Sequence, residues 1–541
     1  MASVTRPSVR SWASLVLFTV ACLPARAAVE HVVIAADGGC DYQIVTPDTV
    51  PDLVVEQCLR QTGRLIQHAF RASGFELPIV KERDRAAGKP CIYLGATAFA
   101  RANGCDPAVL EGWSYFHRVV GRDVVLAGRD EAPPDLSHLG NWNRFFYYRL
   151  GTLKATADFL RLHAQTYFLY PGNAMIPTKG ASRVRDWVFD DASIEFTEMP
   201  SISIPADLNL RKDVFTRYHK RHHRHALLYD VASNFFPRVD DALLGHTYGK
   251  AVPPKTYRES NPEYFALLGG ERTKNNQYCL SNPRVRELIY EFTASFLAAG
   301  CQSVNIQQPD GFRPCQCKEC DALYDTGKDW GEKLWTFHRD IAERLKQEHP
   351  GKKLLLSPYT VTIEPPKTFD TFPDNVIISH VDANFEETTK WCKWRKLHTG
   401  EYGIWIHNWI ANQTSRYTPQ RTPLFIEKQV KFFQEYGVRG IFRDGLGEVY
   451  GLEGPTYYVF GRMFDDPANL TARELVFEFC DSAFGPDAGA SMRRFYDALY
   501  HSIELYALYL NTHGVGWTYK DIYGRGHKAV RDPFRMLSFL Y

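Results

Sequence analysis

The sequence predicts an α/β protein: a (β/α)8, TIM-like barrel preceded by a small α/β domain and followed by a helical segment. From about residue 201, apolar strands alternate with amphipathic helices over about 260 residues, the usual size of such a barrel. The 541 residues of the chain exceed one barrel, so further domains are needed. The predicted boundaries are 1–27 for an export signal, 28–200 for the N-terminal domain, 201–465 for the barrel and 466–541 for the helical segment.

The second half of the chain contains the clearest barrel strands. Each is short and apolar and ends in polar or aromatic residues, and amphipathic stretches separate them. Continuous apolar strands between helices are typical of a parallel sheet covered on both faces. The predicted strands are 302–310, 352–360, 375–383, 402–409 and 439–445, and the predicted helices are 329–348, 386–397 and 422–436.

The regions on either side of the barrel have simpler patterns. In front of it, helical periodicity over Leu53–Ser73 and again from Gly151 alternates with short apolar strands and with a hairpin around Gly121. Behind it, Glu453 is expected at the start of a helix near Gly454 and Pro455. From about residue 467 helical patterns follow over 472–484 and 489–510, and the strands expected before the barrel are 29–35, 76–80, 89–97 and 165–171.

The first 27 residues have the pattern of an export signal. Arg6 and Arg10 precede an apolar run over 12–23, and Ala25-Arg26-Ala27 matches a small-x-small cleavage site. About a dozen apolar residues are too few to span a bilayer, which takes roughly twenty. We therefore expect an exported protein, periplasmic or extracellular, with no membrane insertion after cleavage. The formal net charge of +2 gives no electrostatic case for nucleic acid as a partner.

The N-terminal domain contains phrases whose order is similar to that of a known domain. The phrases are LPI at 77–79, IYLGAT at 92–97, GTLKA at 151–155 and YFLYPGNAMIP at 167–177. In this order they resemble the domain that precedes the barrel of α-glucuronidases and β-hexosaminidases. The resemblance implies a domain that packs against the barrel and contributes little to the chemistry.

The barrel region contains a second, more specific set of phrases. They are NPEYFALLGGERT at 261–273, CLSNPRVREL at 279–288, QPDG at 308–311 and CQCKEC at 315–320. Together they resemble the family of the domain of unknown function 4838, whose characterised branch comprises retaining endo-β-N-acetylglucosaminidases acting on N-glycans. The resemblance covers about residues 30–510. The usual Asn-Asp-Gly of that family is Pro309-Asp310-Gly311 here, so the carboxylate is kept and its neighbour differs.

Glycoside hydrolysis requires an acid that protonates the leaving oxygen and a second group that stabilises the oxocarbenium-like transition state. Barrels carry such groups at the carboxyl ends of their strands. Asp310, Asp382, Asp444 and Glu448 lie at or just after the carboxyl ends of predicted strands and are the candidate catalytic carboxylates. Alternatively, Asp310 is a turn residue before Gly311 and Asp382 caps the next helix. The partner of Asp310 stays open among the other three.

Other residues could contact a sugar, and most of them lie at the ends of predicted strands. His246 lies in a loop between two glycines, and Tyr359 ends the strand 352–360. Alternation places Trp405, His407 and Trp409 on one face of their strand. These three line the sugar site if that face points into the barrel mouth, and they pack against helices if it points outward.

Four cysteines have a spacing compatible with a tetrahedral structural zinc: Cys315, Cys317 and Cys320, with Cys279 from the preceding loop. The alternative is a disulfide, which an exported protein permits. Either arrangement would brace the loop that carries Asp310. We expect no cofactor for the catalysis itself. Motifs of NTPases, zincins and serine hydrolases are absent from the sequence.

These observations predict an exported glycoside hydrolase that cleaves glycans with paired carboxylates. The β-N-acetylhexosaminidase type of cleavage is what the family resemblance implies. Two alternatives stay open: a glycosidase of another specificity, such as one acting on uronic acids, and a barrel that binds carbohydrate without cleaving it.

Overall fold

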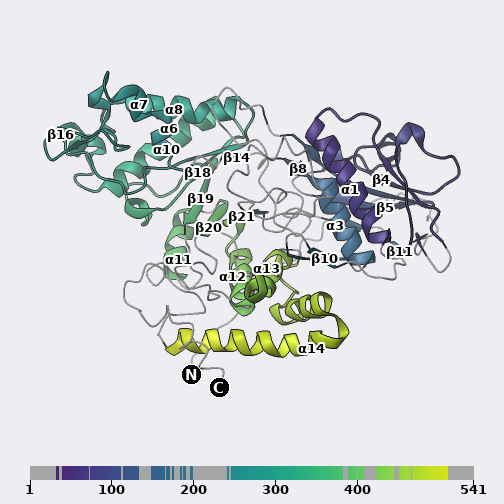
Figure 1. Cartoon of the computed structure of the whole chain (residues 1–541). Coiled ribbons are helices and arrows are strands. Elements are labelled where there is room, and N and C mark those ends of the chain that lie inside the picture. Colours follow the sequence, from purple (N-terminus) through teal and green to yellow (C-terminus); the bar gives the residue numbers. More distant parts are fainter. Residues whose placement is uncertain are drawn as a thin grey trace, which may run out of the picture.

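A computed structural model gives the fold of the chain (Figure 1). It describes residues 32–35, 39–71, 74–110, 114–132, 134, 148–164, 166–170, 173–175, 183–184, 187–189, 195–198, 241–242, 245–381, 388–398, 400–406, 422–443, 450–464 and 466–509. No helix in these ranges is long and apolar enough to cross a membrane.

A six-stranded mixed sheet forms the N-terminal domain (Figure 1). Its strands in spatial order are β12 (Trp187–Phe189), β5 (Tyr115–Val120), β6 (Asp123–Gly128), β4 (Cys91–Leu94), β2 (Gln43–Thr46) and β3 (Ile79–Lys81). The pairs β2–β3, β2–β4 and β4–β6 are parallel, whereas β5 pairs antiparallel with both neighbours. Helices α1 (Leu53–Arg71) and α3 (Gly151–His163) pack against each other and against the sheet. The short helix α2 (Ala98–Ala102) packs on a separate, smaller apolar cluster, where Phe99 stacks on Tyr93.

Most predicted elements of this domain are confirmed, but the strand β2 at its centre was missed. Only Ile44 and Val45 of this strand are apolar, so the sequence shows no alternation to detect. The polar end residue Gln43 is nevertheless buried, because it exchanges two hydrogen bonds of 3.0 Å with the backbone of Ala86. The strand predicted over 29–35 is reduced to β1 (Val32–Val33), which pairs with β11 (Arg183–Val184) outside the six-stranded sheet.

Two glycines let the start of α3 touch the end of β6. A Cβ atom on Gly151 would lie 2.6 Å from the nitrogen of Arg129, and one on Gly128 would lie 2.4 Å from the carbonyl carbon of Gly151. Real Cβ atoms do not approach backbone this closely. The glycine of the phrase GTLKA is therefore required by the contact between two backbones.

We expect Gly151→Ala to lower the free energy of unfolding by about 1–3 kcal/mol, the usual cost of overpacking. Denaturant unfolding of the purified chain measures the change. Gly39→Ala is the control, because nothing lies within 4 Å of its Cβ position, and it should shift stability by less than about 0.5 kcal/mol. Equal effects of the two substitutions would contradict the close-contact explanation.

A seven-stranded parallel sheet follows and accounts for the strands predicted for the barrel. Its spatial order is β13 (Glu195–Glu198), β21 (Val438–Arg443), β20 (Tyr402–Ile406), β19 (Val376–Val381), β18 (Lys353–Leu356), β17 (Ser303–Ile306) and β14 (Asp241–Ala242). Every neighbouring pair is parallel. β13 belongs to this sheet although it precedes the predicted boundary at residue 200. The first strand of the sheet in chain order thus lies beside the last one.

Helices alternate with these strands, and the three predicted over 329–348, 386–397 and 422–436 are confirmed. The helices are α8 (Pro283–Ala298), α10 (Trp330–Glu348), α11 (Thr388–Leu397), α12 (Pro423–Glu435) and α13 (Tyr450–Met463). Between β14 and α8 lies an irregular segment with the short helices α6 (Tyr248–Ala251), α7 (Pro254–Tyr257) and η6 (Pro262–Tyr264) and the hairpin of β15 (Leu267–Leu268) and β16 (Glu271–Arg272). This segment lies at the end of the molecule opposite the N-terminal domain (Figure 1).

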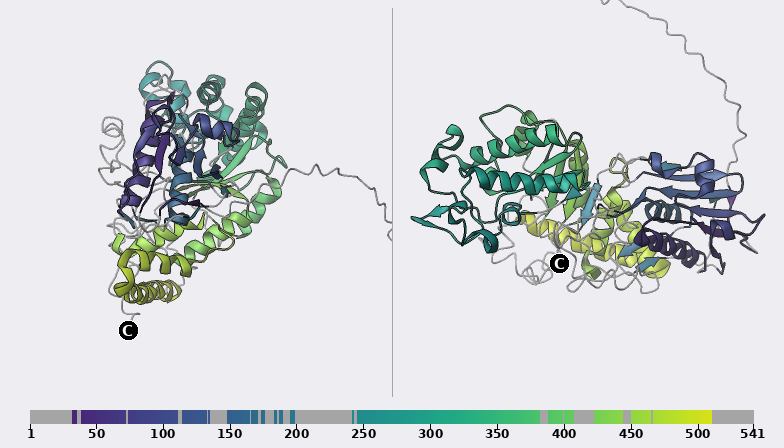
Figure 2. Two further views of the ribbon diagram at one scale, coloured as in Figure 1. Left: turned by 90° about the vertical axis from the view of Figure 1, so that its right-hand side faces the viewer. Right: turned by 90° about the horizontal axis from the view of Figure 1, so that it is seen from above.

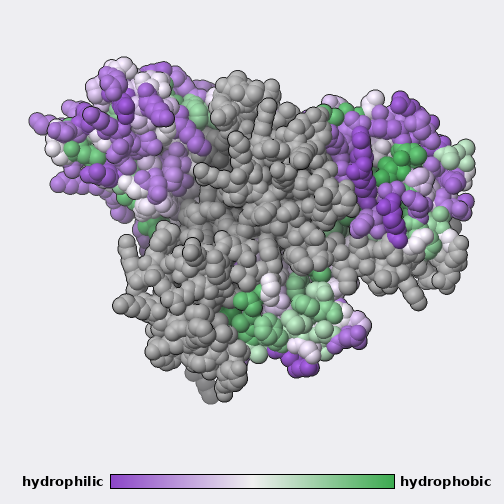
Figure 3. Space-filling model, in the orientation of Figure 1, coloured by the Kyte–Doolittle hydropathy of each residue, from purple (hydrophilic) through white to green (hydrophobic). Residues whose placement is uncertain are grey.

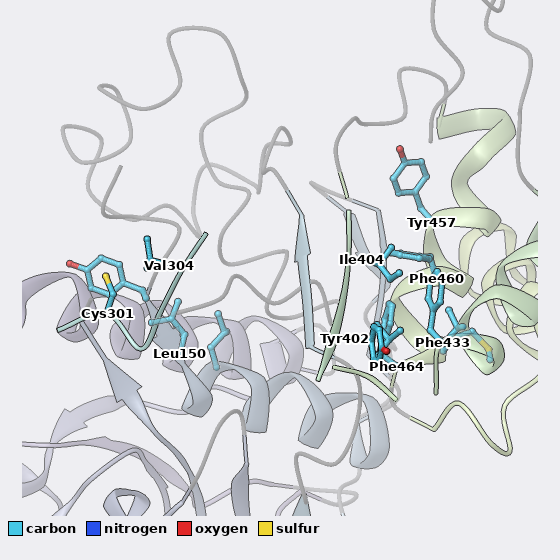
Figure 4. Packing of buried hydrophobic residues seen from close by; sticks show 14 of the residues in the cluster. Leu150, Cys301, Val304, Tyr402, Ile404, Phe433, Tyr457, Phe460 and Phe464 are labelled. Atoms are coloured by element: carbon cyan, nitrogen blue, oxygen red, sulfur yellow. The ribbon is translucent and has the colours of Figure 1, made fainter. Parts of the chain in front are cut away.

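Helices α12 and α13 pack on the parallel sheet. Figure 4 shows Tyr402 and Ile404 of β20 beside Phe433 of α12, Phe460 of α13 and Phe464, which follows α13 directly. Helix α14 (Ala472–Tyr509) combines the two predicted helices and bends between them, at a glycine with φ of 69° that precedes a proline.

Helix α13 begins at Tyr450, earlier than predicted, and contains Pro455. Proline has no N–H to donate to the carbonyl four residues earlier. The hydroxyl of Tyr496 in α14 donates to that carbonyl, Gly451 O, at 2.8 Å. The neighbouring helix therefore satisfies the group that proline leaves without an intrahelical partner, and the sequence signal for a helix start at Pro455 was misleading.

The N-terminal domain and the parallel sheet lie side by side, and the C-terminal helices contact both (Figure 2). Strand β9 (Tyr167–Tyr170), which pairs with β10 (Asn173–Met175), packs against α13 and α14. Pro134 lies at Gly300, just before β17, where a Cβ atom would be 3.1 Å away. The described surfaces of the N-terminal domain and of the segment around α6–α10 are mostly hydrophilic in the view of Figure 3.

Candidate functional site

Three of the predicted site residues lie together at one edge of the parallel sheet. His246 follows β14, Asp310 follows β17 and Tyr359 follows β18. These strands are neighbours and parallel, so their carboxyl ends lie at the same edge. The sequence predicted each residue separately, and the structure brings the three into one cluster.

Asp310 lies in a turn and is held by two donors. The hydroxyl of Tyr359 donates to Asp310 Oδ1 at 2.7 Å, and the amide of Gly311 donates to the same oxygen at 2.9 Å. The side chain is exposed, and Gly311 has a φ of 58°. The turn interpretation of Asp310-Gly311 is therefore correct, and it does not conflict with a role at the site, because the turn presents the carboxylate at the sheet edge.

The hydrogen bond of His246 determines which ring nitrogen carries the proton. Nδ1 lies 2.7 Å from the carbonyl oxygen of Gln308. A carbonyl only accepts, so Nδ1 is the donor and Nε2 is the acceptor of the neutral ring. The His246 side chain is exposed, and the centroid of its ring lies 5.9 Å from the centroid of the Tyr359 ring. Nε2 can thus accept a hydrogen bond from a hydroxyl group brought to this edge.

Buried polar residues that the sequence reasoning missed hold the three loops together. Gln308 is fully buried, and its Nε2 donates to Tyr359 O at 2.7 Å and to Thr362 Oγ1 at 3.1 Å. The amide of Thr247 donates to Gln307 O at 3.1 Å, and its hydroxyl donates to Asn305 O at 3.0 Å. The available signal was the pair of glutamines directly after an apolar strand, where a purely exposed loop would not need to bury an amide.

The loop that carries Tyr359 has a strained backbone. Thr360 has a φ of 52°, a left-handed conformation that is rare for β-branched residues. A hydrogen bond of Thr362 holds this turn in place, since its hydroxyl accepts from the amide of Tyr359 at 3.1 Å. A glycine at the start of α10 packs against it, because a Cβ atom on Gly331 would lie 2.4 Å from Val361 O. Strain of this kind is typical of residues placed for function.

The remaining predicted site residues stay predictions. Asp382, His407, Trp409, Asp444 and Glu448 lie outside the described residues. The backbone of Trp405 belongs to β20, opposite Val381 and Phe442 in the register of the sheet, but its side chain is outside the described part.

The four predicted cysteines form a buried cluster. The sulfur atoms of Cys279, Cys315, Cys317 and Cys320 all lie within 4.8 Å of one another. Hydrogen bonds with Cys315 and Cys320 lower the pKa of Cys279, and the same bond with Cys279 raises the pKa of Cys320. None of the cysteines whose side chains are described is in a disulfide.

The chain matches the domain of unknown function DUF4838 over residues 191–497, which is more than half of its length. The chain belongs to the DUF4838 family. The match begins just before β13 and ends within α14, so the family domain comprises the parallel sheet and its C-terminal helices. None of the curated proteins matches this DUF4838 protein.

Solved structures of glycoside hydrolases are similar to the DUF4838 protein. BtGH115A, a family GH115 4-O-methyl-α-glucuronidase with specificity for decorated arabinogalactans, aligns with a TM-score of 0.50 at 10% identity, over 87% of this chain and 63% of that enzyme. This chain thus spans less than two thirds of the length of the glucuronidase. CpGH84B aligns with a TM-score of 0.41 at 8% identity, over 86% and 78% of the two chains. At 10% identity, the similarity to the glucuronidase concerns the fold alone.

Proposed function

We propose that the DUF4838 protein is an exported glycoside hydrolase that cleaves β-N-acetylhexosaminides in glycans, with Asp310 as one of two catalytic carboxylates. The cluster of Asp310, Tyr359 and His246 at the carboxyl edge of the parallel sheet carries this proposal. The carboxylate there supplies the negative charge that an oxocarbenium-like transition state requires, and the hydroxyl and the imidazole acceptor supply hydrogen-bond partners for a sugar ring.

The proposal includes a closed (β/α)8-type barrel. The sheet runs in chain order from β14 to β21, and β13 lies beyond β21. Its two edge strands, β13 and β14, are therefore consecutive among the strands of the described residues, as expected if the sheet curls round to bring them together. The fold similarity to a glycoside hydrolase supports the same architecture.

The hydrogen bonds of Asp310 favour one of the two roles for this carboxylate. Both donors point at Oδ1, so the group acts as an acceptor in the turn. In the cleavage of an N-acetyl sugar the substrate acetamide can be the nucleophile, and a carboxylate that orients it and balances the positive charge is required. We assign this role to Asp310. The acid that protonates the leaving oxygen is then one of Asp382, Asp444 and Glu448.

Turnover of a substrate panel by the full chain tests the proposal. The panel contains N-glycans and aryl glycosides of N-acetylglucosamine, glucose and glucuronic acid. We expect release of product from the N-acetylglucosaminides, monitored by chromophore release or by mass spectrometry of the glycans. Preferred turnover of glucuronides would overturn the N-acetyl specificity. Binding of glycans without any turnover would overturn the enzymatic function in favour of a carbohydrate-binding barrel.

A further inference from the structure

We propose that Cys279, Cys315, Cys317 and Cys320 bind a single Zn²⁺ ion, which fastens the loop carrying Asp310 to the irregular segment between β14 and α8. The metal site does not depend on the glycosidase activity. Only the consequence for Asp310 rests on the proposed function.

The sulfur positions fit tetrahedral coordination. Zn–S bonds of about 2.3 Å place the four sulfurs of a regular tetrahedron about 3.8 Å apart. Cys279 Sγ lies 3.6 Å from Cys317 Sγ and 3.7 Å from Cys320 Sγ, and all four side chains are buried. A disulfide would require two sulfurs at about 2.05 Å. The four residues thus surround a common centre instead of forming pairs.

The surroundings of the sulfurs suit thiolates. Backbone amides donate to three of them: Leu267 N to Cys315 Sγ at 3.2 Å, Ser281 N to Cys320 Sγ at 3.4 Å and Cys320 N to Cys317 Sγ at 3.4 Å. The guanidinium of Arg272 lies 4.0 Å from Cys315 Sγ and also donates to Phe265 O at 2.8 Å, which holds it in place. Four thiolates and Zn²⁺ carry a net charge of −2, and these donors and the cation offset part of it.

The identity of the metal follows from the ligand set. An all-sulfur tetrahedral site selects zinc or iron, and four protein ligands leave no open position for a substrate or water. The site is therefore structural rather than catalytic. We commit to zinc because its tetrahedral preference does not depend on a redox state.

The ion would reinforce contacts that already join two loops. Gln277, two residues before Cys279, donates to Gly311 O at 3.2 Å and accepts from the amide of Arg313 at 2.8 Å. Farther along, Gln316 N donates to Leu267 O at 2.8 Å, and Gly269 N donates to Gln316 Oε1 at 2.7 Å. Asp310 lies directly before Gly311 and Arg313, which both bond to Gln277. The metal would therefore limit the motion of the turn that presents the Asp310 carboxylate.

Elemental analysis of the purified full chain tests the metal site. We expect one zinc per chain and protection of the four thiols from alkylation until a chelator is added. Loss of a residue that only hydrogen-bonds to a metal ligand lowers metal affinity by roughly 10–100-fold. Cys317→Ser removes a ligand itself, so its zinc affinity should fall by more than that. Cys480→Ser is the matched control, because it removes a buried cysteine of α14 and should keep the zinc.

The thiol-protection measurement uses the unmodified chain and so does not depend on whether Cys317→Ser folds. A metal-free chain with a disulfide among the four cysteines, found by mass spectrometry, would overturn the proposal. A chain that contains iron instead of zinc would overturn the choice of metal.

The link to Asp310 has its own readout. Chelation of the wild-type chain should lower turnover in parallel with zinc loss, and added Zn²⁺ should restore it. Turnover that survives complete zinc removal would overturn the positioning role. Zinc present in a chain that turns over no panel substrate would leave the metal site intact and overturn the proposed function, so the two failures are distinguishable.

Discussion

Asp310→Asn is expected to lower kcat/KM on the best panel substrate by about 10²–10⁴-fold, the range for loss of a positioned acid–base or charge-balancing group. The amide has the shape of the carboxylate and can still accept from the Tyr359 hydroxyl, so the turn should persist. What is lost is the negative charge that stabilises the oxocarbenium-like transition state. The effect should therefore appear in kcat, with a smaller change in KM. Steady-state kinetics with an aryl glycoside measures both.

Two further variants show whether the cluster acts as we propose. Tyr359→Phe removes one hydrogen bond to a charged group, worth about 1.5–3 kcal/mol, so activity should fall by about tenfold or more, yet less than in Asp310→Asn. Asp370→Asn changes an exposed aspartate that precedes β19 and should match wild type. Wild-type activity of Asp310→Asn would show that another carboxylate holds this role.

Hydrophobic pattern was sufficient to predict the parallel sheet but not the polar contacts that build its edge. β18 is an almost continuous apolar run, and β17 alternates polar residues with Val304 and Ile306, so the positions of both strands could be predicted from the sequence. β2 has only two apolar residues and escaped notice, because its ends are buried through hydrogen bonds. The same reason explains why Gln308 was missed. Periodicity reports apolar burial, whereas a buried amide is recognisable only from its partners.

The candidate site was likewise predicted in part from the sequence. Asp310 and Tyr359 were predicted because each lies at the end of a predicted strand, and His246 was predicted because it lies in a loop between two glycines. The parallel order of β14, β17 and β18 then places the three together. The cysteine cluster combines a local motif with Cys279, which lies far away in the sequence, and its geometry became visible only in the fold. The second carboxylate could not be chosen, since strand ends in the sequence do not reveal which of the following loops lie close together in space.

A buried charge network in the N-terminal domain leads to the second large prediction. Asp158 of α3 pairs with Lys154 at 2.7 Å and with Arg161, and it accepts from the Tyr115 hydroxyl at 2.8 Å. Lys154 is fully buried, and Arg462 of α13 is close enough to influence it. Burial alone would raise the pKa of Asp158, but Lys154 and Arg161 hold it well below the ordinary value. The carboxylate is thus the centre of a cationic cluster that faces the C-terminal helices.

We expect Asp158→Ala to destabilise the chain by about 3–5 kcal/mol, because it removes the carboxylate that offsets a buried cation. Glu76→Ala is the matched control: it breaks the exposed pair with Arg71, which should contribute less than about 1 kcal/mol. Urea unfolding followed by circular dichroism measures both changes. Similar midpoints for the two variants would show that the buried network adds little to stability.

The pH dependence of the same comparison identifies the charge as the cause. A carboxyl with a lowered pKa in the folded state contributes stability above its unfolded pKa of about 3.9, and this stability is lost as the pH falls toward the folded value. Burial lowers the pKa of Lys154 to about 7, and Asp158→Ala removes the partner that favours its charged form, so the stability difference between the two chains should grow as the pH falls from neutral toward about pH 5. The difference should shrink below about pH 4, where Asp158 itself becomes protonated. A difference that stays constant in acid would assign the effect to lost packing, since removal of side-chain volume does not titrate.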